Sequence, residues 1–331
     1  MDVRRLELLR ELAERGSITE VAKATHRTPS AVSQQLRVLE REAGLPLTEK
    51  SGRGIVLTDA GRALARSATD VAVAIEHANA LWDEFRNDPT GEVSLASFPT
   101  GGQMLLPGVL HRLDEVGGLT LHCSDRDLES DDFPSITADF DIVLAHTPTP
   151  AATNWASREV VMVKLMTEPL DIALPPGHPL AAKDLLDPED LIGERWIGVP
   201  WGYPFERTIH EISAAAGAPM NIVQRFGDTR VTEAFVAAGL GIAILPCYTA
   251  GGAYRSEIVL RNLRGVVAER HIFALMRPDR AERLAVRTVI DALRAEAAAV
   301  VAANAHRNPP AAAPADPPRA TPTPSGDGRI S

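Results

Sequence analysis

Apolar residues near the start of the chain recur at intervals of three and four, which predicts successive amphipathic helices. The first helix covers residues 3–14, and Gly16 is placed to end it. The second begins at Ser17, because Ser17 and Glu20 have the spacing of an S-x-x-E capping box, and it runs to about residue 24. Two short helices joined by a tight turn are the beginning of a helix-turn-helix.

A third helix follows at once, with Thr28 as its cap, Pro29 in its first turn and Gly44 at its end. Its apolar stripe consists of Val32, Leu36, Leu39 and Ala43, and the opposite side consists of Ser30, Ser33, Gln34, Arg37 and Arg41. An ordinary amphipathic helix with a solvated polar face is the simpler interpretation of one helix alone. The hydroxyls, amide and arginines on this face nevertheless suit base edges and phosphates better than a Glu/Lys mixture does.

Two short strands, at residues 47–50 and 55–58, are predicted around a turn at residues 51–54. This hairpin resembles a wing with Lys50 and Arg53 near its tip, so residues 1–58 form a predicted winged helix-turn-helix domain. The residues expected to contact DNA are Thr28, Pro29, Ser30, Ser33, Gln34, Arg37, Lys50 and Arg53.

The motifs of this segment resemble those of the LysR-type transcriptional regulators. The family pattern is met by Gly16-Ser17, by Ala22 and His26, by the stretch 28–40, and by the exit Leu57-Thr58-x-x-Gly61. Ile18 and Thr48 depart from it, since they stand where the family usually has phenylalanines. The resemblance implies sequence-specific binding to double-stranded DNA, a small-molecule effector, self-association as a dimer or tetramer, and contact with RNA polymerase.

A long helix is predicted next, from Thr58 as its cap to about residue 87. Its apolar residues step at alternating four and three positions, which is a heptad seam made by Leu64, Ala68, Val71, Ile75, Ala78, Trp82 and Phe85. Packing of this helix on its own domain is the alternative. The family dimerises through this linker helix, so residues 59–88 are predicted to dimerise through Leu64, Val71, Ile75 and Trp82, before a hinge at residues 87–91.

From residue 93 onward, short apolar runs alternate with helices, which indicates an α/β domain with largely parallel sheets. Strands are expected at 93–97, 119–123, 140–145, 170–174, 196–199, 222–226, 242–245 and 272–276, those at 119–123 and 140–145 as buried strands, and helices at 103–116, 205–216, 229–238 and 279–303. The resemblance implies a two-lobed effector domain similar to type 2 periplasmic binding proteins. It covers residues 93–306, with lobe I at about 93–159 and 268–306 and lobe II at about 160–267. The Pro/Ala-rich tail 308–331 is predicted to be disordered.

An effector is expected where strands lead into helix N-termini, because free amides there favour anions. By resemblance, the loop 97–103 forms one wall of the cleft. Ser97, Thr100 and Thr229 are the strongest candidates, and the other candidates are Gln103, His146 and Trp201. For each residue, capping a helix or lying on the surface is an equally good explanation. Small neutral hydrogen-bonding groups suit a carboxylate, so an organic acid or an amino acid-like metabolite is predicted.

Composition agrees with a cytoplasmic, multi-domain protein that spans no membrane. The net charge of −10 conceals an asymmetry: residues 1–60 hold ten Lys/Arg and nine Asp/Glu, a net +1, which leaves −11 for the rest. Such a near-neutral DNA-binding domain implies that two or more copies act together. Cys123 and Cys247 have no metal-binding spacing. Buried inert thiols are the expected interpretation, although a redox pair is conceivable.

An enzyme would need a nucleophile with a base, or a metal cluster, and the sequence has no H-x-x-x-H, C-x-x-C or G-x-S-x-G motif. No catalytic residue, cofactor or metal is therefore predicted. The sequence predicts a DNA-binding transcriptional regulator modulated by a small molecule. The alternative is an architectural or constitutive DNA-binding protein that has no effector.

Overall fold

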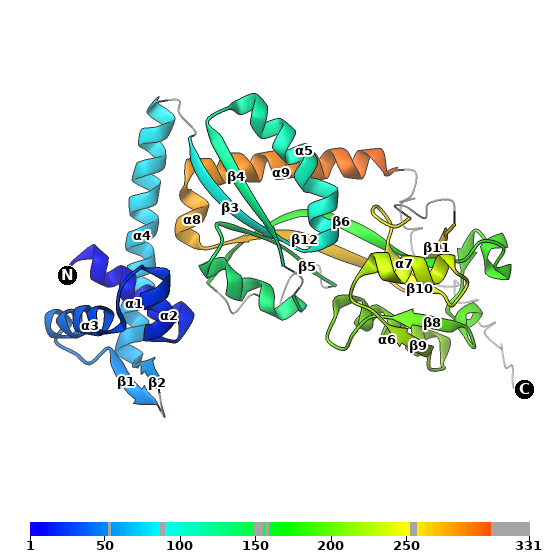
Figure 1. Cartoon of the computed structure of the whole chain (residues 1–331), viewed down its shortest axis with the longest axis horizontal. Coiled ribbons are helices and arrows are strands. Elements are labelled where there is room, and N and C mark those ends of the chain that lie inside the picture. The colour runs from blue at the N-terminus through cyan, green and yellow to red at the C-terminus, as the bar shows by residue number, and fades with distance from the viewer. Residues whose placement is uncertain are drawn as a thin grey trace, which may run out of the picture.

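The computed structural model describes residues 1–51, 54–86, 90–126, 128–148, 155, 159–251 and 257–305. Figure 1 shows the N-terminal helices and hairpin on one side, the long helix α4 (Asp59–Arg86) beside them, and the effector domain extending away from both. Arg53, most of the predicted hinge and the predicted tail lie outside the described residues. No described helix combines the length and the hydropathy that a membrane span requires.

The N-terminal domain is a winged helix-turn-helix, as predicted. It consists of α1 (Val3–Arg15), α2 (Ile18–Ala24), α3 (Pro29–Ala43), β1 (Thr48–Ser51) and β2 (Gly54–Leu57). The Thr28 hydroxyl caps α3 by accepting from the Ala31 amide at 3.2 Å. The predicted capping box of α2 is wrong, because the Ser17 side chain makes no cap hydrogen bond. Packing of the buried Val21 and Ala22 holds α2 in place instead.

Helix α4 belongs at first to the winged-helix core, where Gly61, Ala65 and Ala68 are buried. An added Cβ on Gly61 would lie 2.0 Å from the Leu47 carbonyl oxygen, so only glycine permits this close approach. Farther along, Ala80 is buried, and α4 contacts the effector domain of the same chain.

The effector domain contains a mixed sheet, which corrects the expectation of largely parallel sheets. Strands β3 (Gly91–Ser97), β4 (Leu119–Asp125) and β5 (Ile142–Thr147) are parallel, whereas β12 (Glu269–Met276) is antiparallel to both β5 and β6 (Val161–Leu174). The remaining strands are β7 (Leu185–Leu186), β8 (Arg195–Gly198), β9 (Asn221–Arg225), β10 (Ala243–Pro246) and β11 (Val259–Leu263). The order β4-β3-β5-β12-β6-β11-β7 continues from one lobe into the other, because β6 pairs with β12 and also with β10 and β11.

Helices cover this sheet and the lobe II strands. They are α5 (Pro99–Val116), α6 (Pro204–Ala216), α7 (Thr229–Ala237), α8 (Pro278–Glu282) and α9 (Leu284–Ala303), with 3-10 helices η1 (Ser130–Ala138), η3 (Pro179–Ala182) and η4 (Pro188–Leu191). Helices α5 and α9 lie together over lobe I, and α6 and α7 belong to lobe II (Figure 1).

Four further expectations for this domain are corrected. Helix α5 begins at Pro99 rather than residue 103, because proline is favourable in a first helical turn. The helix predicted at 279–303 is two helices, since Arg283 between them has an extended backbone (ψ 129°). Strand β4 lies at the edge of the sheet and alternates in burial, so it is not a buried strand. Cys123 on β4 is consequently exposed, and only Cys247 is a buried thiol.

The winged-helix domain contacts lobe I of the same chain through α1. Arg277, directly after β12, binds Glu11 at 2.7 Å and Glu14 at 2.9 Å. Arg10 binds Asp279 at 2.8 Å. We call the residues involved the interdomain cluster: Arg10, Glu11, Glu14 and Arg15 of α1 with Asp139, Arg277 and Asp279 of the effector domain.

Candidate functional site

The polar face of α3 lies on the surface, which is where a DNA-reading face must lie. Thr28, Pro29, Ser30, Gln34 and Arg37 are exposed, and Ser33 is half-buried. The Ser33 hydroxyl donates to the Pro29 carbonyl at 2.9 Å, so part of its hydrogen-bonding capacity is used within the helix. Lys50 is exposed on β1 of the wing. The apolar stripe opposite is buried as predicted, with Val32 and Leu39 fully enclosed.

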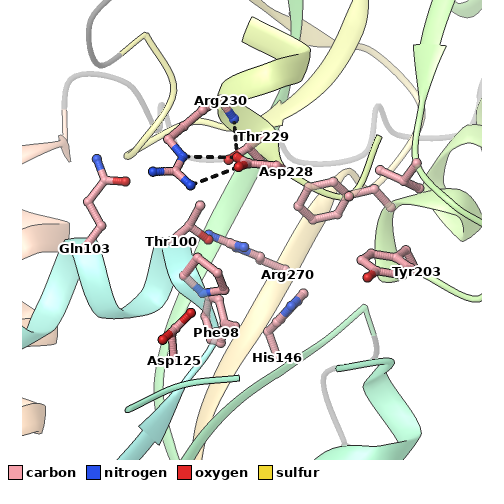
Figure 2. Close-up of a pocket in the computed structure, with 14 residues that line it drawn as sticks. Phe98, Thr100, Gln103, Asp125, His146, Tyr203, Asp228, Thr229, Arg230 and Arg270 are labelled. Carbon is pink, nitrogen blue, oxygen red and sulfur yellow. Dashed lines mark hydrogen bonds and ion pairs between the residues drawn. The ribbon is translucent and has the colours of Figure 1, made fainter. Parts of the chain in front are cut away.

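A cavity of about 740 Å³ opens between the two lobes. It brings together residues from the ends of strands and the starts of helices in both lobes (Figure 2). The residues that line it are Phe98, Pro99, Thr100, Gln103, Asp125, His146, Val199, Tyr203, Phe205, Gly227, Asp228, Thr229, Arg230 and Arg270.

Four of the predicted effector-binding residues, Thr100, Gln103, His146 and Thr229, line this cavity. Ser97 and Trp201 do not. Ser97 is 3% exposed, and its hydroxyl donates to the Phe98 carbonyl at 2.9 Å, so this side chain bonds to the backbone of its own loop. Trp201 is 67% exposed and stacks with the Arg225 guanidinium at 3.8 Å, so it faces outward rather than into the cavity.

Aromatic rings form the base of the cavity. The His146 ring lies 4.4 Å from that of Phe98 and 6.3 Å from that of Phe205, which places lobe I and lobe II rings together. Burial, and secondly the charge of Arg270, hold the pKa of His146 well below its ordinary value. His146 is therefore neutral near pH 7 and contributes a flat, uncharged surface.

Arg270 comes from the crossing strand β12 and is almost completely buried beneath the cavity. Its Nε and Nη2 lie 2.8 and 2.6 Å from Glu168 Oε2, and Glu168 is fully buried on β6. The Arg270 guanidinium lies 5.1 Å from the Phe98 ring centroid and 5.7 Å from that of Phe205. One buried ion pair between the two crossing strands therefore supports the aromatic base.

The mouth of the cavity carries charges of both signs. Asp228 caps α7 by accepting from the Arg230 amide, and its carboxylate also binds the Arg230 guanidinium at 3.1 and 2.9 Å (Figure 2). This hydrogen bond from Arg230 holds the pKa of Asp228 below its ordinary value. Asp125, at the end of β4, lines the opposite wall in lobe I.

Sequence reasoning missed Arg270 and its partner Glu168. Both strands carry other charges, Glu269 on β12 and Lys164 and Asp171 on β6, so the local sequence does not single out the two residues that pair in the interior. Asp228 carried the signal of an N-cap residue directly before a helix. Phe98 lies in the loop 97–103 that was predicted as one wall of the cleft, although it was not singled out, and Phe205 carried no signal that distinguishes a cavity wall from a core.

The seam of α4 divides into two parts in the structure. Leu64 packs against the winged-helix core, and Val71 is half-buried. Ile75 is 39% exposed, Trp82 is 60% exposed and Phe85 is 80% exposed. The opposite side of the helix is occupied within the chain, since His77 binds Glu282 at 3.1 Å and Glu84 binds Arg287 at 2.6 Å. The outer half of the seam is thus an uncovered apolar stripe.

Among the residues that the structure describes, no group of three or more His, Cys, Asp or Glu side chains could hold a metal ion. A winged helix-turn-helix joined by a long helix to a two-lobed domain with a cavity defines a DNA-binding regulator that has a ligand-binding domain. Residues 3–62 match the bacterial regulatory helix-turn-helix proteins of the LysR family, and residues 86–298 match the LysR substrate binding domain. The chain belongs to the LysR family of transcriptional regulators.

Known relatives agree in extent and in fold. The chain is 27% identical over 253 residues to the HTH-type transcriptional regulator YybE of Bacillus subtilis, which covers 74% of this chain and 82% of that protein. A full-length OxyR variant from Pseudomonas aeruginosa has a similar fold, with a TM-score of 0.62 and 21% identity, covering 89% of this chain and 98% of that one. CbnR complexed with its target DNA has a TM-score of 0.52 and 22% identity, covering 90% and 100% of the two chains.

Proposed function

We propose that this regulator places α3 in the major groove, contacts phosphates through its wing and responds to a small molecule in the cavity between its lobes. The observation that carries the proposal is that one chain combines two surfaces. One is the exposed polar face of α3, and the other is the cavity between the two lobes of the C-terminal domain. The complex of CbnR with its target DNA favours the same use of the fold here.

Replacing Gln34 by alanine should change which operator sequences are preferred. An exposed amide on the reading face can pair with adenine, and a good side chain–base pair contributes about 1–3 kcal/mol of discrimination. Lys50→Ala is the matched control. It should weaken all sequences alike and lower the salt dependence, because a phosphate contact carries no sequence information. Selection from a random DNA pool measures both, and an unchanged preference for Gln34→Ala would show that another face reads the bases.

The cavity favours a small organic acid or an amino acid-like metabolite as effector. Phe98 occupies the N-cap of α5 and has no acceptor atom, so its side chain does not cap the first amides of this helix. Those amides attract a carboxylate. Asp125 on the same lobe offers a partner for an ammonium group, and the aromatic base suits an apolar side chain. An amino acid-like ligand uses all three features.

Thr100→Val should abolish the response to the effector while DNA binding and dimerisation persist. Thr100 lines the cavity in the first turn of α5, and valine removes its hydroxyl at nearly constant volume. We expect the affinity for the effector, measured by calorimetry, to fall about 10- to 150-fold, which corresponds to the loss of one hydrogen bond to a charged group. Unchanged affinity would show that Thr100 and its loop do not contact the effector.

A constitutive DNA-binding protein without an effector is the competing function. Thermal unfolding across a panel of amino acids and organic acids separates the two, because a ligand that binds only the folded state raises the unfolding temperature. A hit identifies the effector class, and a panel without any hit favours the constitutive alternative.

The uncovered stripe on α4 favours a dimer, and the resemblance to the family extends this to a tetramer and to contact with RNA polymerase. We place the protein in the cytoplasm, where bacterial DNA lies, and assign it no catalytic activity, consistent with a family of transcriptional regulators.

A further inference from the structure

The charged side chains of the cavity between the lobes do not balance. The guanidinium groups of Arg230 and Arg270 both belong to the cavity. Arg230 pairs with Asp228 at 2.9 Å, and Arg270 pairs with Glu168 at 2.6 Å. Each of these positive charges is therefore matched by a carboxylate of the protein itself. A further carboxylate, that of Asp125, lines the wall of the cavity in lobe I.

The carboxylate of Asp125 joins no ion pair with any residue that the structure describes. Its neighbour Arg126 is engaged elsewhere. The Arg126 side chain donates from Nη1 to the Asp125 backbone carbonyl at 2.7 Å, and its guanidinium lies 5.4 Å from the centroid of the Phe140 ring. Asp125 is exposed, so its negative charge is open to a ligand in the cavity. A positively charged group on that ligand is attracted to it.

Asp125 lies beside the N-terminus of helix α5. Asp125 and Ser97 are register partners on the parallel strands β4 and β3, and paired strands lie about 4.8 Å apart. The pairing continues by one residue, because the Arg126 amide donates to the Ser97 carbonyl at 2.8 Å. Helix α5 begins two residues after Ser97, at Pro99. A carboxylate and a helix N-terminus are therefore neighbours in one wall of the cavity (Figure 2).

The first turn of α5 offers backbone amides to a ligand. Pro99 has no amide hydrogen, and the Gly102 amide donates to the Phe98 carbonyl at 3.0 Å. The amides of Thr100 and Gly101 come before that bond, at positions where a helix supplies no acceptor. The Phe98 side chain does not cap them, because its ring lies against Gly101, where an added Cβ would be 2.5 Å from the ring. Free amides at this end of a helix attract a carboxylate.

The base of the cavity suits an uncharged substituent. The rings of Phe98, Phe205 and His146 form this base, and His146 is neutral near pH 7 because burial lowers its pKa. Val199 and Tyr203 add surface from lobe II. A ligand whose charged groups lie at the start of α5 therefore has an apolar and aromatic surface beside it.

We propose that Asp125 is the specificity-determining residue of the cavity, and that it selects ligands with a protonated amine beside a carboxylate over the same acids without the amine. Free amino acids with apolar side chains have this arrangement. The inference rests on the proposed function, because it concerns the ligand of the same cavity, and it decides between the organic acid and the amino acid-like metabolite.

Each charged group of the ligand has its own reason to be required. An acid without an amine brings its carboxylate close to that of Asp125 with no positive charge between them, and like charges at this separation repel. An amine without a carboxylate leaves the amides of Thr100 and Gly101 without an acceptor after water has been displaced from them. A ligand that carries both groups on one carbon satisfies the carboxylate and the amides together.

The test compares ligands that differ by one charged group, using calorimetry on the full-length protein. The first set consists of phenylalanine, hydrocinnamate, which lacks the amine, and phenethylamine, which lacks the carboxylate. The second set consists of leucine, isocaproate and isoamylamine, which differ in the same way. In at least one set we expect the amino acid to bind about 10- to 150-fold more tightly than either counterpart, which corresponds to one hydrogen bond to a charged group.

Substitutions of Asp125 identify the residue that makes the selection. Asp125→Asn should remove most of the preference for the amino acid over the deaminated acid, and Asp125→Lys should reverse it, because lysine attracts the acid. Asp125→Glu should restore the preference. Asp125 is exposed at the end of an edge strand, so these changes disturb no core. Asp114→Asn is the matched control, because it removes an exposed carboxylate of α5 outside the cavity and should leave the preference unchanged.

Equal affinity of the wild type for an amino acid and its deaminated acid would overturn the inference, and so would a preference that survives both Asp125→Asn and Asp125→Lys. In either case a small molecule still binds, so the proposed function would stand. Binding by no probe of either set would also overturn the inference. The proposed function itself fails only if the wider panel of metabolites gives no rise in the unfolding temperature either.

Discussion

Replacing Ile75 by aspartate should convert the dimer into a monomer and weaken operator binding by about 10²–10⁴-fold. Ile75 lies on the outer half of the α4 seam, 39% exposed, in line with Trp82 and Phe85, whose rings stack at 5.6 Å. A surface stripe this apolar marks a site of association, and the opposite side of α4 is already occupied by the effector domain. The described part of the chain leaves the stripe exposed, and we expect a second chain to cover it.

The size of the effect follows from the charge of the DNA-binding domain. Residues 1–60 carry a net charge of only +1, so one copy binds phosphates weakly, and two linked copies gain by effective concentration. Sedimentation measures the mass, and a titration of operator DNA measures the affinity. Ala63→Asp places the same charge at an exposed position off the seam and should behave as wild type. Equal masses for wild type and Ile75→Asp would refute the proposal that the α4 seam forms the dimer interface.

Arg270→Met should lower the free energy of unfolding of the effector domain by about 3–5 kcal/mol, the usual cost of removing one partner of a buried ion pair. Glu168 is fully buried, and its Oε2 takes both contacts from Arg270. Its other oxygen accepts from the Tyr248 amide at 2.9 Å, which is too little to compensate a buried negative charge. Methionine keeps the length of the side chain but supplies no charge.

Urea denaturation monitored by intrinsic fluorescence measures this loss. Adding Glu168→Gln should recover part of it, because the stranded charge disappears. Arg230→Met is the matched control in the same cavity: the Arg230 side chain is 78% exposed and pairs with Asp228 at the surface, so the unfolding midpoint should hardly move. A small effect of Arg270→Met would mean that water reaches Glu168 in solution.

The two functional surfaces differ in how far local sequence predicts them. The reading face of α3 is one helix, so Ser30, Gln34 and Arg37 follow from a period of 3.6 residues, and the structure places them on the surface as expected. The cavity is assembled from segments as far apart as Thr100 and Arg270. Four of its residues were predicted from the rule that ligands lie where strands lead into helices. Arg270 escaped that rule because it lies within a strand.

Ser97 and Trp201 show the limit of the same rule. Both lie at the strand ends where the rule predicts ligand contacts. The Ser97 hydroxyl nevertheless donates to the Phe98 carbonyl, and the Trp201 ring stacks on Arg225 outside the cavity. The direction of a loop side chain depends on which partners tertiary packing brings within reach. Local sequence does not contain those partners.

Local sequence predicts the winged helix-turn-helix, the extent of α4 and the alternation of strands and helices, because each depends on caps, glycines and apolar periods within a few residues. Long-range packing sets the antiparallel course of β12, the pairing of Arg270 with Glu168 and the contact of α1 with lobe I. Each of these joins residues more than a hundred positions apart. Buried charges need partners of opposite sign, but only the folded chain selects which partner each one meets.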